Sequence, residues 1–424
     1  MISSLKNALG PGFIMAGAAI GVSHLVQSTR AGAEFGTSLI GLVLLACLFK
    51  YPFLEFGARY AAATGESMID GFGRLGKWAV WLFALITVST MFVILASVSL
   101  VTAGLAGVVF GLSVSPVWLA LGVLLASVGV LVLGQYRGLD ITMRLIIIIL
   151  MVSTIIAVVL ALAQVADVST LNPSAHWARI WTAGGFAFVL ALLGWMPIPL
   201  DVAVWQSLWT LERSKQSRAP ATVPASVFDF KLGYLTATLS AVVFVLLGAA
   251  VFGGTGQALP SSAVAFSDAL ITAYTDSLGS WAYGLMALAA LSAMFSTTLA
   301  VSDAYPRVLF GLWQCLKPST NATGERRESA EQTQSRYATI LVVNALGALI
   351  VIAFFGAQFT RLIDFATTVS FLSAPLLGWL SLRLITQPWV AREHQPSGPL
   401  KALAISGLIF LMAFSVAWLF WRLA

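Results

Sequence analysis

The chain is organised as a series of long apolar runs separated by short polar segments. A helix needs about 20 apolar residues to cross the hydrocarbon core of a bilayer. By this criterion the sequence predicts an all-α polytopic membrane protein with about eleven membrane-spanning helices. The spans are expected near residues 11–34, 38–62, 77–108, 114–136, 143–166, 184–210, 231–254, 280–304, 336–356, 361–385 and 400–422. Segment 257–279 is too polar to span and fits a helix lying on the surface.

The composition supports a bilayer as the solvent of this chain. Hydrophobic residues make up 59% of it and charged residues only 9%, whereas soluble domains carry about 25% charged residues. The net charge of +6 comes from scattered single residues, so no nucleic-acid partner is expected. Cys47 and Cys315 form no metal or redox motif, no catalytic motif is present, and we expect neither an enzyme nor a resident cofactor. The expected partners are lipid and a small-molecule or ion substrate.

Lysine and arginine are distributed unequally between alternate loops. With the N-terminus inside, the outside segments hold only Arg179, Arg361 and Arg422. The inside segments hold Lys6, Arg74, Lys77, Arg137, Arg144, Arg213, Lys215, Arg218, Lys231, Arg307, Lys317, Arg326, Arg327, Arg336, Arg383, Arg392 and Lys401. Because cytoplasmic loops are enriched in Lys and Arg, the sequence predicts a cytoplasmic (inner) membrane protein with its N-terminus inside and its C-terminus outside.

Two of the predicted spans contain features that interrupt a helix. The first span runs through glycines at 17 and 21 into a polar stretch that begins at Ser23 and His24. In the sixth span, Pro197 and Pro199 each remove a backbone donor, so that carbonyls one turn earlier lose their partners. Inside a bilayer such carbonyls must be satisfied by protein, water or a ligand.

The two interruptions fall in the first and the sixth of the first ten spans. This is the arrangement expected for two five-helix repeats of inverted topology, and interrupted segments at matching places indicate a site near the middle of the membrane. We therefore expect a single transport domain over residues 1–424. It would hold repeat one at about 11–166, repeat two at about 184–385 and an extra helix at about 400–422.

Several short motifs resemble the Nramp family of divalent metal ion transporters. They are Gly10-Pro11-Gly12-Phe13, Ala31-Gly32-Ala33-Glu34-Phe35-Gly36, Ala58-Arg59, Thr64-Gly65-Glu66-Ser67 and Trp195-Met196-Pro197. The resemblance implies a leucine-transporter-like fold, a substrate site between broken helices one and six, and transport of a divalent cation coupled to protons.

The chain departs from this family at the residues that would bind the metal. The family's first-helix motif Asp-Pro-Gly-Asn aligns with Gly21, Val22, Ser23 and His24, and its sixth-helix motif Met-Pro-His-Asn aligns with Met196, Pro197, Ile198 and Pro199. The resemblance makes these eight residues the expected substrate site. Dications prefer anionic oxygen ligands, and the carboxylate is missing. The remaining candidate metal ligands are Met196 and His24, with Asp201 as the source of negative charge.

The sequence leaves the substrate open between a divalent cation and a different small solute, and it also allows a non-transporting membrane sensor. His24 is the best candidate for proton coupling because imidazole titrates near neutral pH. Asp201 is a second candidate because an acid inside a span is unusual. Arg30 and Glu34, four residues apart, are expected to form a structural or gating pair, with direct contact to the solute as the alternative. We expect Lys50 to be structural with a partner on another helix, Asp303 and Asp364 to be exposed or capping, and Ser296, Thr297, Thr298 and Ser302 to join helices.

Overall fold

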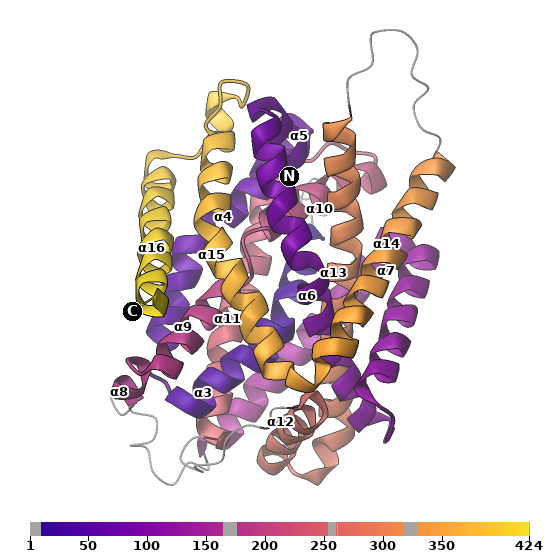
Figure 1. Cartoon of the computed structure of the whole chain (residues 1–424), viewed down its shortest axis with the longest axis vertical. Helices are drawn as coiled ribbons and strands as arrows, with labels where there is room; N and C mark the ends of the chain where they lie inside the picture. The colour runs from indigo at the N-terminus through magenta and orange to yellow at the C-terminus, as the bar shows by residue number, and fades with distance from the viewer. Residues whose placement is uncertain (1–9, 164–175, 253–259, 261, 318–329, 424) are drawn as a thin grey trace.

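The computed structural model describes residues 10–163, 176–252, 260, 262–317 and 330–423, and shows an all-helical bundle (Figure 1). The first half contains α2 (Pro11–Ala19), a π-helical segment η1 (Ile20–Ser28), α3 (Thr29–Phe35), α4 (Ile40–Thr64), α5 (Met68–Leu75), α6 (Lys77–Val109) and α7 (Pro116–Ala163). The second half contains α8 (Trp177–Ile180), α9 (Ala183–Trp195), α10 (Val202–Ser217), α11 (Val223–Phe252), α12 (Ala263–Leu278), α13 (Tyr283–Leu316), α14 (Ala330–Phe355), α15 (Phe359–Ile385) and α16 (Gly398–Leu423). Short 3-10 turns cover Ser280–Ala282, Gly356–Gln358 and Arg392–His394.

Within the described residues, seven helical stretches are long and apolar enough to cross a membrane, so the chain is a multi-pass membrane protein. One of these stretches, Gln332–Ile385, contains two of the predicted spans. The fourth and fifth predicted spans fall in a single helix, α7, and the first and sixth are divided into shorter pieces. The number eleven therefore remains a prediction, as does the division into two repeats. α12 confirms a helix within 257–279, but it packs against α6 and α13.

Both predicted interruptions are present. The first span loses regular helical geometry at Gly21, where ψ is −123°, and continues as the π-helical segment η1. The sixth span stops at Trp195 and resumes at Val202, with a non-helical stretch between them. Pro197 and Pro199 lie in this stretch, as expected from their missing N–H groups. The backbone of both predicted sites is therefore irregular at the positions that the sequence indicates.

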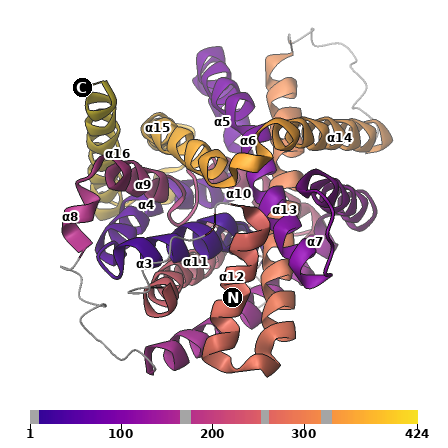
Figure 2. The same ribbon diagram turned by 60° about the horizontal axis from the view of Figure 1, so that its bottom comes forward.

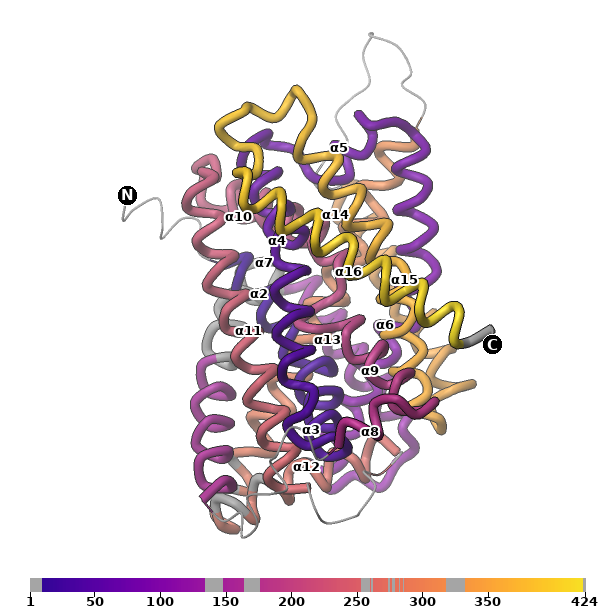
Figure 3. The backbone as a smooth tube through the Cα atoms, turned by 90° about the vertical axis from the view of Figure 1, so that its left-hand side faces the viewer, coloured from indigo at the N-terminus to yellow at the C-terminus, as the bar shows by residue number. Residues whose placement is uncertain are grey.

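The interrupted helices lie at the centre of the bundle. All residues from 188 to 207 are buried, and so are all residues from 14 to 32. Seen from one end, α10 and α13 lie in the middle of the molecule, whereas α8, α14 and α16 lie at its periphery (Figure 2). α16 runs along the outside against α4 and α15 (Figure 3). Irregular backbone is tolerated at membrane depth where protein surrounds it.

Segments with many basic residues gather at one end of the bundle. Figure 1 shows α5 and the turn between α15 and α16 at this end, and α3, α8 and α12 at the other. Side-chain contacts agree, because Arg59 donates to the carbonyl of His394 and the guanidinium of Arg383 lies over the Trp78 ring. This matches the predicted grouping of loops, while the side of the membrane that each end faces remains a prediction.

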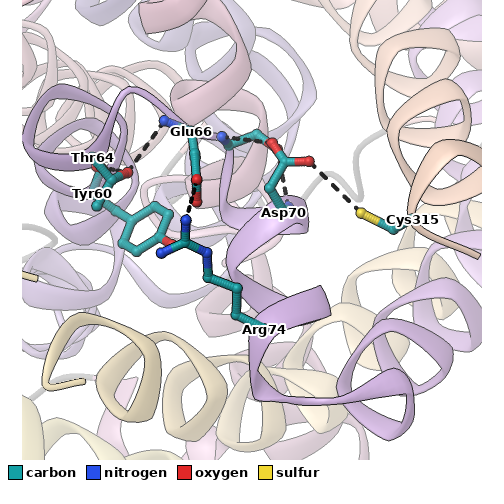
Figure 4. A network of polar contacts seen from close by, with 7 residues as sticks. Tyr60, Thr64, Glu66, Asp70, Arg74 and Cys315 are labelled. Atoms are coloured by element: carbon teal, nitrogen blue, oxygen red, sulfur yellow. Dashed lines mark hydrogen bonds and ion pairs between the residues drawn. The ribbon is translucent and has the colours of Figure 1, made fainter. Parts of the chain in front are cut away.

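The Thr64–Ser67 motif forms the turn between α4 and α5 at the same end (Figure 4). Gly65 ends α4 with a φ of +71°, a conformation that favours glycine. Ser67 and Asp70 then form a capping box that starts α5, and Glu66 pairs with Arg74. The polar residues of this motif therefore stabilise the ends of two helices.

The close packing of α3 on α11 provides a test of the fold. A Cβ atom added to Gly248 would lie 2.1 Å from the carbonyl oxygen of Thr29, and one added to Gly32 would lie 2.0 Å from that of Val245. Gly248→Ala should therefore lower the free energy of unfolding by about 1–3 kcal/mol, because the two backbones must separate. Gly41→Ala is the matched control, since a Cβ there meets nothing within 4 Å. Equal unfolding curves for both variants in detergent would contradict this packing.

Candidate functional site

The two interruptions meet in the centre of the molecule. The Ser23 hydroxyl lies 3.5 Å from the carbonyl oxygen of Pro197. The Ser28 hydroxyl lies 3.7 Å from the Met196 sulfur. The fold thus places predicted site residues from the first and sixth spans, more than 160 positions apart in the chain, in direct contact.

A small cavity of about 20 Å³ lies where these segments meet. Its lining is Ala18, Val22, Ser23, Ile94, Val98, Trp195, Ile198, Pro199, Val202, Trp205, Thr297 and Val301. Four of the eight predicted binding residues belong to it, and they are Val22, Ser23, Ile198 and Pro199. The only polar side chains in this lining that could bond a solute strongly are Ser23 and Thr297, apart from the indoles of Trp195 and Trp205. A volume of this size holds about one water molecule.

Side chains of the first helix and its neighbours bond main-chain carbonyls around the first interruption. The carbonyl oxygen of Ala19 lies 2.5 Å from the Ser23 hydroxyl and 2.5 Å from Nδ1 of His24. Nε2 of His24 lies 2.8 Å from the carbonyl oxygen of Ala237 on α11. Thr297 on α13 donates to the carbonyl of Gly17 at 2.7 Å. His24 therefore bridges the interruption to α11 and is absent from the cavity lining.

The carbonyls freed at the second interruption are bonded by a side chain from α4. Nζ of Lys50 lies 2.7 Å from the carbonyl oxygens of both Leu193 and Gly194, and 3.4 Å from that of Ile198. Lys50 is fully buried. The prediction of a partner on another helix is thus confirmed, although the sequence could not name the three carbonyls as that partner.

The three candidate metal ligands have different partners in this structure. The two ring nitrogens of His24 lie next to two carbonyl oxygens, Met196 contacts the Ser28 hydroxyl, and Asp201 lies at the N-cap position of α10. Among the described residues, no group of three His, Cys, Asp or Glu side chains is placed to hold a metal ion. The ligand set of the present arrangement is therefore poor in the anionic oxygens that a dication requires.

Arg30 forms the centre of a polar cluster beyond the first interruption. Its guanidinium lies 2.8 Å from Asp364 on α15, 3.7 Å from Glu34 and 2.9 Å from the amide oxygen of Gln27. It also covers the Phe188 ring of α9, 4.9 Å from the ring centroid. Arg30 and Glu34 pair as predicted. The shorter bond to Asp364 was not expected, because its sequence position indicated only exposure or capping.

A second polar cluster lies toward the opposite end and corrects the prediction for Asp303. Its carboxylate is buried and accepts hydrogen bonds from Arg307 at 2.7 Å, Tyr337 at 2.8 Å and Trp209 at 3.0 Å. Asp303 is therefore neither exposed nor a cap, because three helices supply its donors. A cavity of about 470 Å³ adjoins this cluster, lined by Ser67, Asp70, Leu131, Leu208, Leu211, Glu212, Lys215, Arg307, Phe310, Gly311, Gln314, Thr333, Gln334 and Tyr337.

Two interrupted helices crossing in a buried polytopic bundle define a class of membrane transporter fold. Comparison with known proteins identifies the family within this class. The profile of the natural resistance-associated macrophage protein-like (Nramp) family matches residues 12–421. An uncharacterized protein of Pasteurella multocida (strain Pm70) is 33% identical over 411 residues, which cover 96% of this chain and 91% of that protein. The chain therefore belongs to the Nramp family, whose members are transporters and not enzymes.

Solved structures with low sequence identity share the fold. The Eremococcus coleocola manganese transporter superposes with a TM-score of 0.72 at 14% identity, covering 98% of this chain and 86% of that one. MhsT, in complex with L-phenylalanine, gives 0.65 at 15% identity over 95% and 98% of the two chains. Mhp1, a nucleobase-cation-symport-1 family transporter, gives 0.61 at 13% identity over 97% and 92%. The fold is thus shared by proteins with metal and organic ligands, so it does not select between them.

The bridging role of His24 predicts the effect of its removal. His24→Ala leaves the Ala237 carbonyl without its imidazole partner and should lower the free energy of unfolding by about 1–3 kcal/mol. His176→Ala, outside the predicted spans, is the control and should change it little. Thermal unfolding of both purified variants measures the difference. Equal melting temperatures would contradict a bridging role.

Proposed function

We propose that this protein is a secondary transporter that moves a small uncharged solute, rather than a divalent cation, by alternating access around its two interrupted helices. The carrying observation is the chemistry of the groups around the point where the interruptions meet, which are aliphatic, indole and hydroxyl groups. An uncharged solute needs only a few placed hydrogen bonds in an apolar pocket. A dication needs oxygen ligands with negative charge.

The packing at Gly21 supports a site without a carboxylate. A Cβ atom added at Gly21 would lie 2.4 Å from the Thr297 hydroxyl oxygen and 2.7 Å from the Thr297 Cβ. Any side chain at position 21 therefore collides with a branched residue, which also donates to the Gly17 carbonyl. The space next to the first interruption is filled, so that an aspartate here would require Thr297 to move.

Alternating access needs contacts that can break at each end of the pathway, and we assign this role to the two polar clusters. The Arg30 cluster joins the first interrupted helix to α15, and the Asp303 cluster joins α10 to α13 and α14. Each cluster ties one interrupted helix to helices that pack around it. Breaking one cluster at a time would open one end of the pathway while the other stays closed.

Flux measurements test this function directly. The purified protein is reconstituted in liposomes, and uptake of labelled neutral amides, polyols and zwitterionic amino acids is compared with uptake of Mn²⁺ and Mg²⁺. We expect saturable flux of an organic solute and none of either metal. Ser23→Ala should raise the half-saturating concentration about tenfold, because it removes one hydrogen bond of about 1.5 kcal/mol to the solute. Ser89→Ala, on an exposed part of α6, should leave it unchanged.

Two results would overturn the proposal. Saturable Mn²⁺ or Mg²⁺ flux would restore the divalent cation of the family as the substrate. Absence of flux for every solute, from protein that melts normally, would favour a membrane sensor that retains the transporter fold. Liposomes without protein are the control that measures leakage of each solute across the bilayer.

The Arg30 cluster predicts a local effect of charge removal. Arg30→Gln loses its bond to Asp364 and should speed amide hydrogen exchange in α3 and in the first turns of α15, because both lose their shared partner. Arg361→Gln is the matched control, since this exposed side chain donates to nearby Gln358 at the start of its own helix, α15. Equal rates of amide hydrogen exchange in the two variants would contradict a gating role of Arg30.

A further inference from the structure

The ammonium group of Lys50 lies where the carbonyls at the end of α9 converge. The oxygens of Leu193, Gly194 and Ile198 surround it, at 2.7, 2.7 and 3.4 Å. The first two belong to the last turn of α9, where the helix dipole places partial negative charge. A cluster of carbonyl oxygens at a helix C-terminus, at membrane depth, is the kind of site at which membrane transporters hold a small cation.

The number of donors matches the number of acceptors. An ammonium group has three N–H donors and no acceptor, and three carbonyl oxygens face it here. None of the hydrogen bonds described for Nζ goes to a carboxylate. Asp201 lies at the N-cap of α10, on the other side of the second interruption from α9. Main-chain oxygens therefore supply the direct coordination of the charge.

Two contacts fix the position of Lys50 against the interruption. Gly57 brings α4 so close to α10 that a Cβ there would lie 2.0 Å from the Ala203 carbonyl oxygen. Tyr234 on α11 donates to the carbonyl of Cys47 at 2.5 Å. α4 is thus held from both sides of Lys50, and its side chain is directed at the carbonyls by rigid helices.

We propose that these three carbonyls form a cation site whose permanent occupant is the tethered ammonium group of Lys50, which excludes free metal ions. This proposal rests on the proposed function, because a group that excludes metal ions has a purpose only if the transported solute is not a metal ion. Ile198 both lines the central cavity and bonds Lys50. The positive charge therefore lies behind the wall of the solute site, where it stabilises the interruption and opposes the entry of a dication.

Replacing Lys50 by a neutral residue should leave the three carbonyl oxygens free to bind a small cation. In Lys50→Gln the side chain is neutral and leaves carbonyl oxygens without a donor, so the melting temperature should fall by about 5 °C or more. NaCl or KCl should recover at least half of this loss, whereas choline chloride at equal ionic strength should not, because choline is too large for the site. The wild-type protein and the control Lys401→Gln, at an exposed position, should melt at the same temperature in all three salts.

Hydrogen exchange of the wild-type protein gives a second measurement that needs no variant. Amides of residues 193–201 should show the same protection in NaCl, KCl and choline chloride, because Lys50 already occupies the carbonyls. Selective protection of this segment by Na⁺ or K⁺ would show that the site accepts free ions and would overturn the proposal. Identical melting of a folded Lys50→Gln variant in all three salts would overturn it as well. If Lys50→Gln does not fold, the wild-type exchange decides the question.

The outcome is separate from that of the flux experiment, because no solute is added. Mn²⁺ flux through the wild-type protein would contradict the proposed function. The salt dependence of Lys50→Gln melting would still test whether the Lys50 ammonium group occupies the carbonyls. Flux of an organic solute would support the proposed function. Protection of residues 193–201 of the wild-type protein by Na⁺ would at the same time contradict the proposal that Lys50 occupies the site.

Discussion

A helix that stops inside a bilayer leaves carbonyl oxygens without their internal partners, and no lipid can replace those partners. In this protein, side chains of the chain itself do so at both interruptions. Ser23 and His24 bond the carbonyl of Ala19, and Lys50 bonds those of Leu193 and Gly194. The interruptions can persist without a bound ligand, and the surrounding helices must be placed to deliver these donors.

This constraint links the fold to the chemistry of the site. The chain shares its fold with the Eremococcus coleocola manganese transporter, but its cavity is walled mostly by apolar groups and the space beside Gly21 is filled by Thr297. The ionisable side chains beside the second interruption are Lys50, whose Nζ bonds the end of α9, and Asp201 at the N-cap of α10. Fold and site thus carry different information, because proteins with the same fold can bind different ligands.

The interrupted helices were largely predictable from the sequence, because proline and glycine act on the backbone locally. Pro197 and Pro199 end a helix in any surroundings, and the contact between the two interrupted segments follows from the family resemblance at Trp195–Pro197. The partners of long polar side chains were less predictable. Asp303 was expected to be exposed or to cap a helix, but Arg307, Tyr337 and Trp209 converge on it from three helices.

The sequence alone determined that this is a multi-pass membrane protein, where its first and sixth spans break, and which residues lie at the breaks. These properties depend on hydrophobicity and on local backbone chemistry, which are written in short stretches of chain. Only the tertiary structure decided what bonds the freed carbonyls, which residues wall the cavity, and that Lys50 lies at the end of α9. Those facts depend on how helices that are distant in the sequence pack together. The spacing of residues along one helix does not determine which side chains of another helix lie within hydrogen-bonding distance.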